Sequence, residues 1–280
     1  MIVYRTRKDL TSHLAALRDR GKIIGFVATM GALHEGHVSL IERAKIENDA
    51  LVVSIFVNPT QFNDPADLEN YPRKLDEDLQ MLQSMEVDIA FAPSVEEMYP
   101  EEDHRTFDLG GLDRVMEGKY REGHFNGVAR IVSKLFETIS PDRAYFGRKD
   151  FQQLVIIRKL VELLELDIAI IGCPIVREPD GLALSSRNEL LTREERKAAP
   201  FIYITLKIAR EKKAVLSPAA LKSWVAEQFD NQPLMKLIYF EIVDDKNLRS
   251  VESWTEHVNK VGCIAVQMSR VRLIDNVNFD

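Results

Sequence analysis

The chain has 280 residues, enough for one large domain or two modest ones. Hydrophobic residues make up 45% and charged residues 29%, as in an ordinary globular protein, and no apolar stretch reaches membrane-spanning length. The net charge of −7 gives a nucleic-acid partner no electrostatic support. Because the first residues do not form a signal peptide, we expect a cytoplasmic protein with no membrane attachment.

Strand-like and helix-like segments alternate through the first 176 residues. We predict strands at residues 23–29, 51–57, 87–92, 143–146 and 167–176, and helices at 34–45, 67–85, 128–139 and 150–166. The run LVVSIFV is typical of a strand buried on both faces, and Asp150 can cap the helix that begins there. This alternation predicts an α/β fold, a Rossmann-like parallel sheet flanked by helices with right-handed crossovers.

The pattern changes after about residue 180, where we predict helices at 193–213 and 218–229 and strands at 237–243 and 261–274. We therefore expect a larger Rossmann-like domain over residues 1–176 and a smaller α+β lid domain over residues 177–280, with a hinge at 177–188. Cys173 and Cys263 lie in apolar runs without metal or redox spacing, so buried free thiols are expected.

The sequence TMGALHEGH directly follows the first of these predicted strands. His34 and His37 are three residues apart, a spacing that places them on one face of a helix. A helix N-terminus carries unpaired N–H groups and a partial positive charge, which suit a polyphosphate, and Gly31 and Gly36 would let it approach the backbone. A zinc site is the alternative, although further ligands are not evident in the sequence.

Polar residues follow two other predicted strands. Asn58 and Gln61 come after LVVSIFV, and GRKDFQQ at residues 147–153 comes after the strand at 143–146. In open α/β sheets, ligands bind outside the carboxyl ends of the strands, where amides suit a small polar substrate and Lys149 could neutralise phosphate. The alternatives are an Asn-Pro turn and a capped helix start. No phosphate-loop or dinucleotide-binding glycine pattern is present, so NAD is not expected.

Two further segments could bind charged groups. Ser185, Ser186 and Arg187 lie in the predicted hinge, where they could close on phosphate oxygens, or form an ordinary polar loop. The acidic run that includes Asp78 could hold Mg²⁺ through water, although such a run is usually a solvated helix face.

Seven segments together resemble one enzyme family. In chain order they are TMGALHEGH, SIFVNPTQF, YPR, GHFNGV, FGRKDFQQL, VREPDGLALSSRN and RLIDN. They are similar to the pantothenate synthetases (pantoate–β-alanine ligases), and HEGH with the later LSSRN resembles the wider His-x-Gly-His nucleotidyltransferases and their mobile loop. The resemblance covers essentially the whole chain.

The resemblance implies a two-step reaction that uses ATP and Mg²⁺. The carboxylate of (R)-pantoate would attack the α-phosphorus of ATP, forming pantoyl-adenylate and releasing pyrophosphate. The amine of β-alanine would then displace AMP and give pantothenate. The family also implies a homodimer.

The resemblance further implies roles for individual residues. His34, His37, Lys149, Ser185 and Arg187 would be catalytic, with His37 as the proton donor and Lys149 at phosphate. Gln61 and Gln153 would hold pantoate, Asn58, Tyr71 and His124 would shape the pocket, and Asp78 would lie near Mg²⁺. The ATP site would comprise Met30, Gly31, Ala32, Leu33, His34, Glu35, Gly36, His37, Gly147, Arg148, Lys149, Asp150, Val176, Leu184, Ser185, Ser186 and Arg187.

Three positions depart from the family pattern. Arg148 stands where a glutamate is usual, Leu75 where proline is frequent and Glu77 where aspartate is common. Two other functions remain open at this point: a nucleotidyltransferase with a different acceptor, which would form neither an amide nor AMP, and a nucleotide-binding regulatory protein without catalysis.

Overall fold

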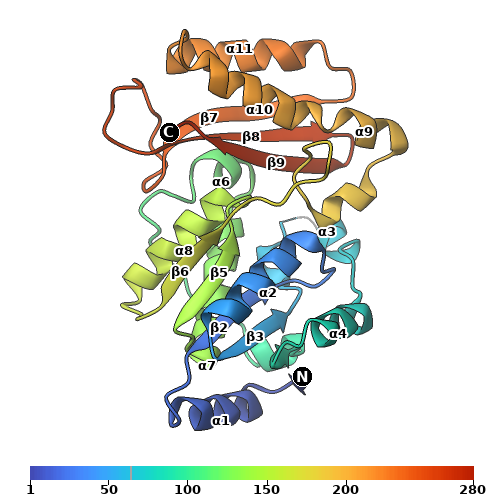
Figure 1. Ribbon diagram of the computed structural model, residues 1–280, viewed down its shortest axis with the longest axis vertical. Helices are drawn as coiled ribbons and strands as arrows, with labels where there is room; N and C mark the ends of the chain where they lie inside the picture. Colours follow the sequence, from blue (N-terminus) through green and yellow to red (C-terminus); the bar gives the residue numbers. More distant parts are fainter. Residues whose placement is uncertain (64) are drawn as a thin grey trace.

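The structure of the protein is a computed structural model that describes residues 1–63 and 65–280. Within these residues the N-terminal part forms a six-stranded parallel sheet of order β1-β4-β3-β2-β5-β6 (Figure 1). This confirms the predicted α/β architecture. The strands are β1 (Ile2–Tyr4), β2 (Ile24–Thr29), β3 (Ala50–Ile55), β4 (Ile89–Phe91), β5 (Arg143–Gly147) and β6 (Ala169–Cys173).

Strand β2 is the point at which the order of the sheet reverses. The chain moves outward through β3 and β4 on one side of β2, then returns to pair β5 with its other side and β6 beyond. Val27 is therefore paired with Val53 on one side and with Tyr145 on the other. A crevice at the carboxyl ends of β2 and β5 is where an open α/β sheet binds its ligand.

Helices cover both faces of this sheet because successive strand residues point to opposite faces. Phe26 and Val52 pack with α1 (Arg7–Arg18), α7 (His124–Ile139) and α8 (Phe151–Leu163), whereas Val27 and Val53 pack with α2 (Glu35–Glu47) and α4 (Leu75–Ser84). The helices of this part are α1 (Arg7–Arg18), α2 (Glu35–Glu47), α3 (Pro65–Glu69), α4 (Leu75–Ser84), α5 (Val95–Met98), α6 (Met116–Tyr120), α7 (His124–Ile139) and α8 (Phe151–Leu163), with a 3₁₀ turn η1 (Pro59–Gln61).

The C-terminal part contains an antiparallel sheet, β7 (Lys236–Asp244), β8 (Lys260–Met268) and β9 (Val271–Asn278), in that order. Helices α10 (Phe201–Lys212) and α11 (Pro218–Asp230) cover one face of it at the top of Figure 1. The 3₁₀ turn η2 (Ser186–Leu190) and α9 (Arg193–Ala198) lead into this unit. None of the helices that the structure describes is long and apolar enough to cross a membrane.

An apolar cluster joins the two units. Met116, Phe125 and Phe151 of the N-terminal part pack with Val243 and Val261 of the C-terminal sheet. The small sheet is therefore covered by helices on one face and by the body of the protein on the other. The division of the chain at residue 176 remains a prediction.

Several element boundaries differ from the predictions. The predicted helix at 67–85 is two helices, since Pro72 disfavours helical backbone at the residue before it and α4 begins at Leu75. The predicted helix at 193–213 is also two helices, α9 and α10, which are separated at Ala199 and Pro200. The predicted strand at 261–274 is the hairpin of β8 and β9, with Ser269 left-handed at the turn (φ 44°). Strand β1 and helix α1 were not predicted.

Candidate active site

A cavity of about 230 Å³ lies at the carboxyl ends of β2 and β5, where the sheet order reverses. The structure brings most of the predicted site residues together around it, although they come from segments more than 100 residues apart. The predicted residues that line the cavity are Met30, His34, Gly36, His37, Asn58, Gln61, Tyr71, Gly147, Lys149, Asp150, Gln153, Val176, Leu184, Ser185, Ser186 and Arg187.

The carboxylate of Asp78 binds the backbone of the loop between β2 and α2. One carboxylate oxygen of Asp78 accepts from the Ala32 N–H (2.9 Å) and the other from the Leu33 N–H (2.8 Å). Gly31 is left-handed (φ 80°), and a Cβ there would come within 2.8 Å of the Asp78 carboxylate. Glycine is therefore required at this position, both for the backbone angle and for the close approach of the carboxylate.

His34 and His37 cap the helix on which they lie. The Nδ1 atom of His34 accepts from the Gly36 N–H (3.1 Å), and Nδ1 of His37 accepts from the His34 N–H (3.3 Å). The two rings lie 4.2 Å apart between centroids. Because each Nδ1 is an acceptor, each neutral ring carries its proton on Nε2 and can donate from that atom.

Both rings are neutral at pH 7. Burial is the main cause that lowers the pKa of His37 to about 3, and the neighbouring His34 and Lys149 add to it. Burial and Lys149 also lower the pKa of His34. An anion bound beside the rings would raise both pKa values, because an opposite charge favours the imidazolium. In its neutral form His37 is a hydrogen-bond donor, and its role as a proton donor remains a prediction.

Amide side chains also line the cavity. Gln61 and Asn58 come from η1 and the residue before it, and Gln153 comes from the first turn of α8. The neighbouring Gln152 points elsewhere: its amide donates to the carbonyls of Leu112 and Val115. Of the neighbouring Gln152 and Gln153, it is therefore Gln153 whose side chain can contact a ligand in the cavity.

The loop at residues 147–150 contributes Lys149 and Asp150. Asp150 occupies the N-cap position of α8 but makes no capping hydrogen bond within the described residues, so the predicted cap is wrong. Its carboxylate instead lines the cavity. The side chain of Asn276 on β9 donates to the Arg148 and Lys149 carbonyls (2.8 and 3.0 Å). The C-terminal sheet therefore holds the loop that carries Lys149.

The segment at residues 184–187 lines the cavity and leads into the C-terminal unit. The Leu184 N–H donates to the Val176 carbonyl (3.0 Å), and the Ser185 hydroxyl accepts from the Arg187 N–H (3.3 Å). Just before it, Arg177 forms an ion pair with the buried Asp275 (2.6 Å). This segment is thus tied to β9 close to the residues that hold the Lys149 loop.

Seven predicted site residues do not line the main cavity. Gly31, Ala32 and Leu33 shape the loop above Asp78, while Glu35 and Arg148 are exposed. His124 lies in an adjoining pocket, where its Nδ1 donates to the Gln61 carbonyl (2.7 Å) and its Nε2 accepts from Arg121 (3.0 Å). Burial and Arg121 lower the pKa of His124 to about 4, so this ring is neutral as well.

The Mg²⁺ prediction for Asp78 finds no geometric support. Asp78 is 2% exposed, and the loop backbone already engages both of its oxygens. Across the part of the chain that the structure describes, no group of three or more His, Cys, Asp and Glu could hold a metal. Cys173 and Cys263 are buried free thiols, as predicted.

Sequence reasoning missed the apolar wall of the cavity. Phe56, Leu40, Val132 and Leu135 lie between the polar groups. Their only signal in the sequence is the apolar spacing of a strand and two helices, which does not separate residues facing a cavity from residues in the core.

Comparison with known proteins identifies the family. The Pantoate-beta-alanine ligase family profile matches residues 2–278. A pantothenate synthetase of Bacteroides thetaiotaomicron is 53% identical, covering 100% of this chain and 99% of that protein.

Two solved structures agree with this assignment. A pantothenate synthetase of Thermus thermophilus has a TM-score of 0.93 at 42% identity, covering 100% of this chain and 99% of that one. The pantoate-β-alanine ligase of Francisella tularensis, solved in complex with β-γ ATP and β-alanine, has a TM-score of 0.82 at 38% identity, covering 100% and 98%. The chain therefore belongs to the pantoate–β-alanine ligase (pantothenate synthetase) family of amide-forming ligases.

Proposed function

We propose that this protein condenses (R)-pantoate with β-alanine at the expense of ATP, giving pantothenate, AMP and pyrophosphate through pantoyl-adenylate. The observation that carries the proposal is that one cavity gathers groups suited to both substrates. The imidazoles, Lys149 and the 185–187 segment line it together with the amides of Asn58, Gln61 and Gln153. Such a site suits a triphosphate and a small hydroxy acid side by side.

The first step needs positioning and neutralisation of charge more than covalent help from the protein. A pantoate carboxylate oxygen bonds to the α-phosphorus while the bond from that phosphorus to the pyrophosphate breaks. The Nε2–H groups of His34 and His37 donate to phosphate oxygens, and the Lys149 ammonium offsets the charge that develops there. The hydroxyls of Ser185 and Ser186 and the Arg187 guanidinium close on the departing pyrophosphate.

In the second step, the β-alanine nitrogen bonds to the acyl carbon of the adenylate. The bond from that carbon to the phosphate oxygen breaks, AMP leaves and the nitrogen loses a proton. Gln61 and Gln153 hold the pantoyl group during both steps, the Asp150 carboxylate accepts from a ribose hydroxyl, and Val176 lies against adenine. The apolar side chains of the cavity wall, such as Phe56 and Leu135, help to exclude water, which would otherwise hydrolyse the anhydride.

Mg²⁺ would enter on the nucleotide, because the described residues form no protein cage for it. Mg²⁺ is usually bound by phosphate oxygens of the substrate together with only a few protein groups. When bound, it would neutralise triphosphate charge. The homodimer and the cytoplasmic location remain predictions, of which light scattering on the purified protein tests the first.

Product analysis tests the proposal. The protein is incubated with ATP, Mg²⁺, (R)-pantoate and β-alanine, and each component is omitted in turn. We expect AMP, pyrophosphate and pantothenate only in the complete mixture, and pantoate-dependent exchange of pyrophosphate into ATP without β-alanine. ADP and phosphate as products would overturn the adenylate route, and a well-folded protein without turnover would indicate another acceptor or a regulatory role.

A further inference from the structure

The amide of Asn58 is fixed at both ends by backbone groups. Asn58 is 1% exposed, and its Oδ1 accepts from the N–H (3.4 Å) and the hydroxyl (3.1 Å) of Thr60. Its Nδ2 donates to the Gly127 carbonyl (3.2 Å). A backbone N–H can only donate and a carbonyl can only accept, so the orientation of the Asn58 amide is determined.

This orientation determines that of Gln61 in turn. The Nδ2 of Asn58 also donates to the Gln61 Oε1 (3.1 Å), which places the Gln61 Nε2 on the other side of its amide, 2.9 Å from the Met30 sulfur. One N–H of the Gln61 Nε2 donates to the Met30 sulfur, so Gln61, which lines the cavity, has its second N–H to offer a ligand there. A ligand beside it must offer oxygen acceptors, as a carboxylate or hydroxyl does.

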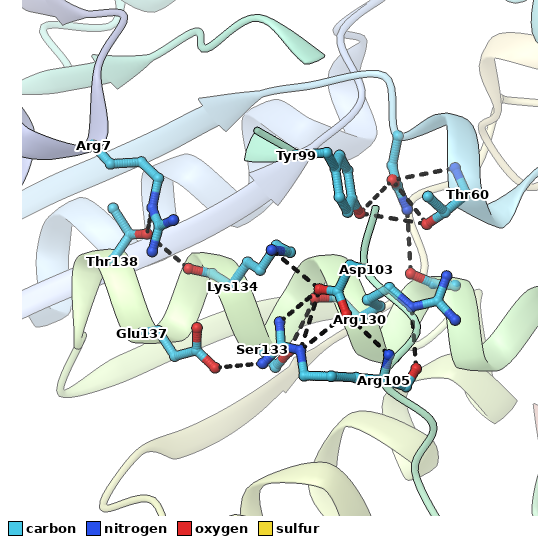
Figure 2. A network of polar contacts seen from close by, with 12 residues as sticks. Arg7, Thr60, Tyr99, Asp103, Arg105, Arg130, Ser133, Lys134, Glu137 and Thr138 are labelled. Carbon is cyan, nitrogen blue, oxygen red and sulfur yellow. Dashed lines mark hydrogen bonds and ion pairs between the residues drawn. The ribbon is translucent and has the colours of Figure 1, made fainter. Parts of the chain in front are cut away.

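Tyr99 donates a further hydrogen bond to the pair formed by Asn58 and Gln61. Its hydroxyl donates to the Asn58 Oδ1 (2.8 Å) and lies 3.3 Å from the Thr60 hydroxyl. Tyr99 comes from the end of α5 and does not line the cavity, so it does not touch a substrate there. Figure 2 shows Tyr99 and Thr60 directed toward this junction.

Charged side chains of α7 and the preceding loop hold the Tyr99 ring. The Lys134 ammonium lies 5.1 Å from the ring centroid and pairs with Asp103 (3.0 Å), which also pairs with Arg105 (3.0 Å). Phe56, which lines the cavity, lies 6.3 Å from the Tyr99 ring between centroids. The contacts drawn in Figure 2 thus hold the Tyr99 ring and restrict where its hydroxyl can lie.

We propose that Tyr99 is a positioning residue that acts through Asn58 to keep the Nε2 end of the Gln61 amide toward the substrate, so that the site selects a ligand with oxygen acceptors. The identity of that ligand as pantoate rests on the proposed function. The chain Tyr99–Asn58–Gln61 joins segments that lie about 40 residues apart in the sequence.

Tyr99→Phe removes the donor and keeps the ring. The lost hydrogen bond is expected to raise the KM for (R)-pantoate about two- to tenfold, with the KM for ATP changed less than about twofold. Tyr4→Phe is the matched control, because its hydroxyl bonds His13 (2.7 Å), away from the site. Equal effects on both substrates, or none, would overturn the proposal.

A double-mutant cycle separates positioning from a general structural role. In a Gln61→Ala background, Tyr99→Phe should produce no further change in pantoate affinity, because Gln61 is the residue through which Tyr99 acts. The same fold-change in both backgrounds would overturn the proposal. Calorimetry of (R)-pantoate binding, with a non-hydrolysable ATP analogue present, provides the readout without turnover. It therefore tests the inference even if the wild-type protein forms no pantothenate.

Discussion

The two imidazoles of the cavity are held by the same helix turn that they cap. His34 and His37 exchange hydrogen bonds with the backbone of that turn, and this exchange selects the Nε2–H tautomer of each ring. A Cβ at Gly36 would lie 2.7 Å from the His34 ring, so no larger residue fits at position 36 without displacing the ring. The donor atoms that the two histidines offer to a ligand therefore depend on this helix cap as well as on the presence of the two rings.

Replacing His37 should abolish most of the activity while leaving the fold intact. His37→Ala removes one phosphate donor, and we expect kcat to fall about 100-fold or more, as for other transition-state donors. Steady-state AMP formation measures the effect, and circular dichroism monitors the fold. His257→Ala, at an exposed position of the C-terminal unit, is the control. Near-normal turnover in His37→Ala would remove this residue from the mechanism.

The neutral histidines also make stability depend on pH. Below pH 6.5 the unfolded chain binds a proton at His37, whereas the folded protein does not until about pH 3. The free energy of unfolding should therefore fall as the pH decreases from 7 to 5. Urea titrations should show this fall to be smaller in His37→Gln by roughly 1 to 2 kcal/mol. An identical fall in both proteins would contradict the depressed pKa.

At the scale of elements, the site is assembled from short segments that follow strands β2, β3, β5 and β6. The 3₁₀ turn η1 carries Gln61, and it packs against the first turns of α7, where Gly127 provides the close approach. The polar segments lie on the same side of the sheet because the carboxyl ends of parallel strands share one edge. The arrangement of η1 against α7 fixes the amide side of the cavity.

A methyl group at Gly127 should displace η1. A Cβ at this position would lie 2.2 Å from the Thr60 carbonyl oxygen, a contact with backbone that cannot rotate away. We expect Gly127→Ala to lower the melting temperature and to raise the KM for (R)-pantoate. The comparison variant is Gly172→Ala, where the new Cβ would meet side-chain atoms of Leu154 and Arg148 at 2.9 and 3.3 Å. Since side chains can yield, Gly127→Ala should be the more damaging of the two, as thermal unfolding and kinetics will show.

The sequence was most informative where buried strands alternate with helices. The apolar runs predict the four central strands, because a parallel strand buried on both faces has no polar alternation to confuse it, and they also predict the second edge strand, β6. The edge strand β1 has only three residues, and Ile2 and Val3 are exposed, so it carries no comparable pattern. Helix α1 buries only Leu10 and Leu14, too few to mark it clearly.

The sequence predicted which residues gather at the site better than what each one does. The strand ends place the polar segments at one edge, so the positions of His37, Lys149 and Gln61 follow from the fold. The support that Asp78 gives to the loop and that Tyr99 gives to Asn58 depends on contacts between distant segments. No local pattern specifies such contacts.

At the scale of the whole molecule, the C-terminal sheet is joined to the body by polar contacts beside the cavity. Glu117 on α6 accepts from Arg272 on β9 (2.7 Å) and from Tyr239 on β7 (3.1 Å). The rings of Tyr239 and Tyr120 stack 6.0 Å apart. With the apolar cluster that the two units share, these contacts place the sheet against the body rather than away from it (Figure 1).

Removing the Asn276 side chain should weaken this connection at the Lys149 loop. Asn276→Ala deletes two hydrogen bonds to the loop, and we expect kcat/KM for ATP to fall about tenfold or more. Asn278→Ala on the same strand is the control, because the Asn278 side chain is exposed and accepts from the Asp280 N–H at the end of the chain. Equal losses in the two variants would contradict a specific role for Asn276.

The central place of β2 has a consequence for biosynthesis. Its partner β3 follows soon after it, but its other partner, β5, begins only at Arg143. At about 5–20 residues per second, a ribosome leaves that side of β2 without its partner for several seconds. Unpaired strand edges promote aggregation during this interval. The residues at 184–187 emerge later still, so no ligand of the cavity can stabilise the nascent chain until most of the protein has been made.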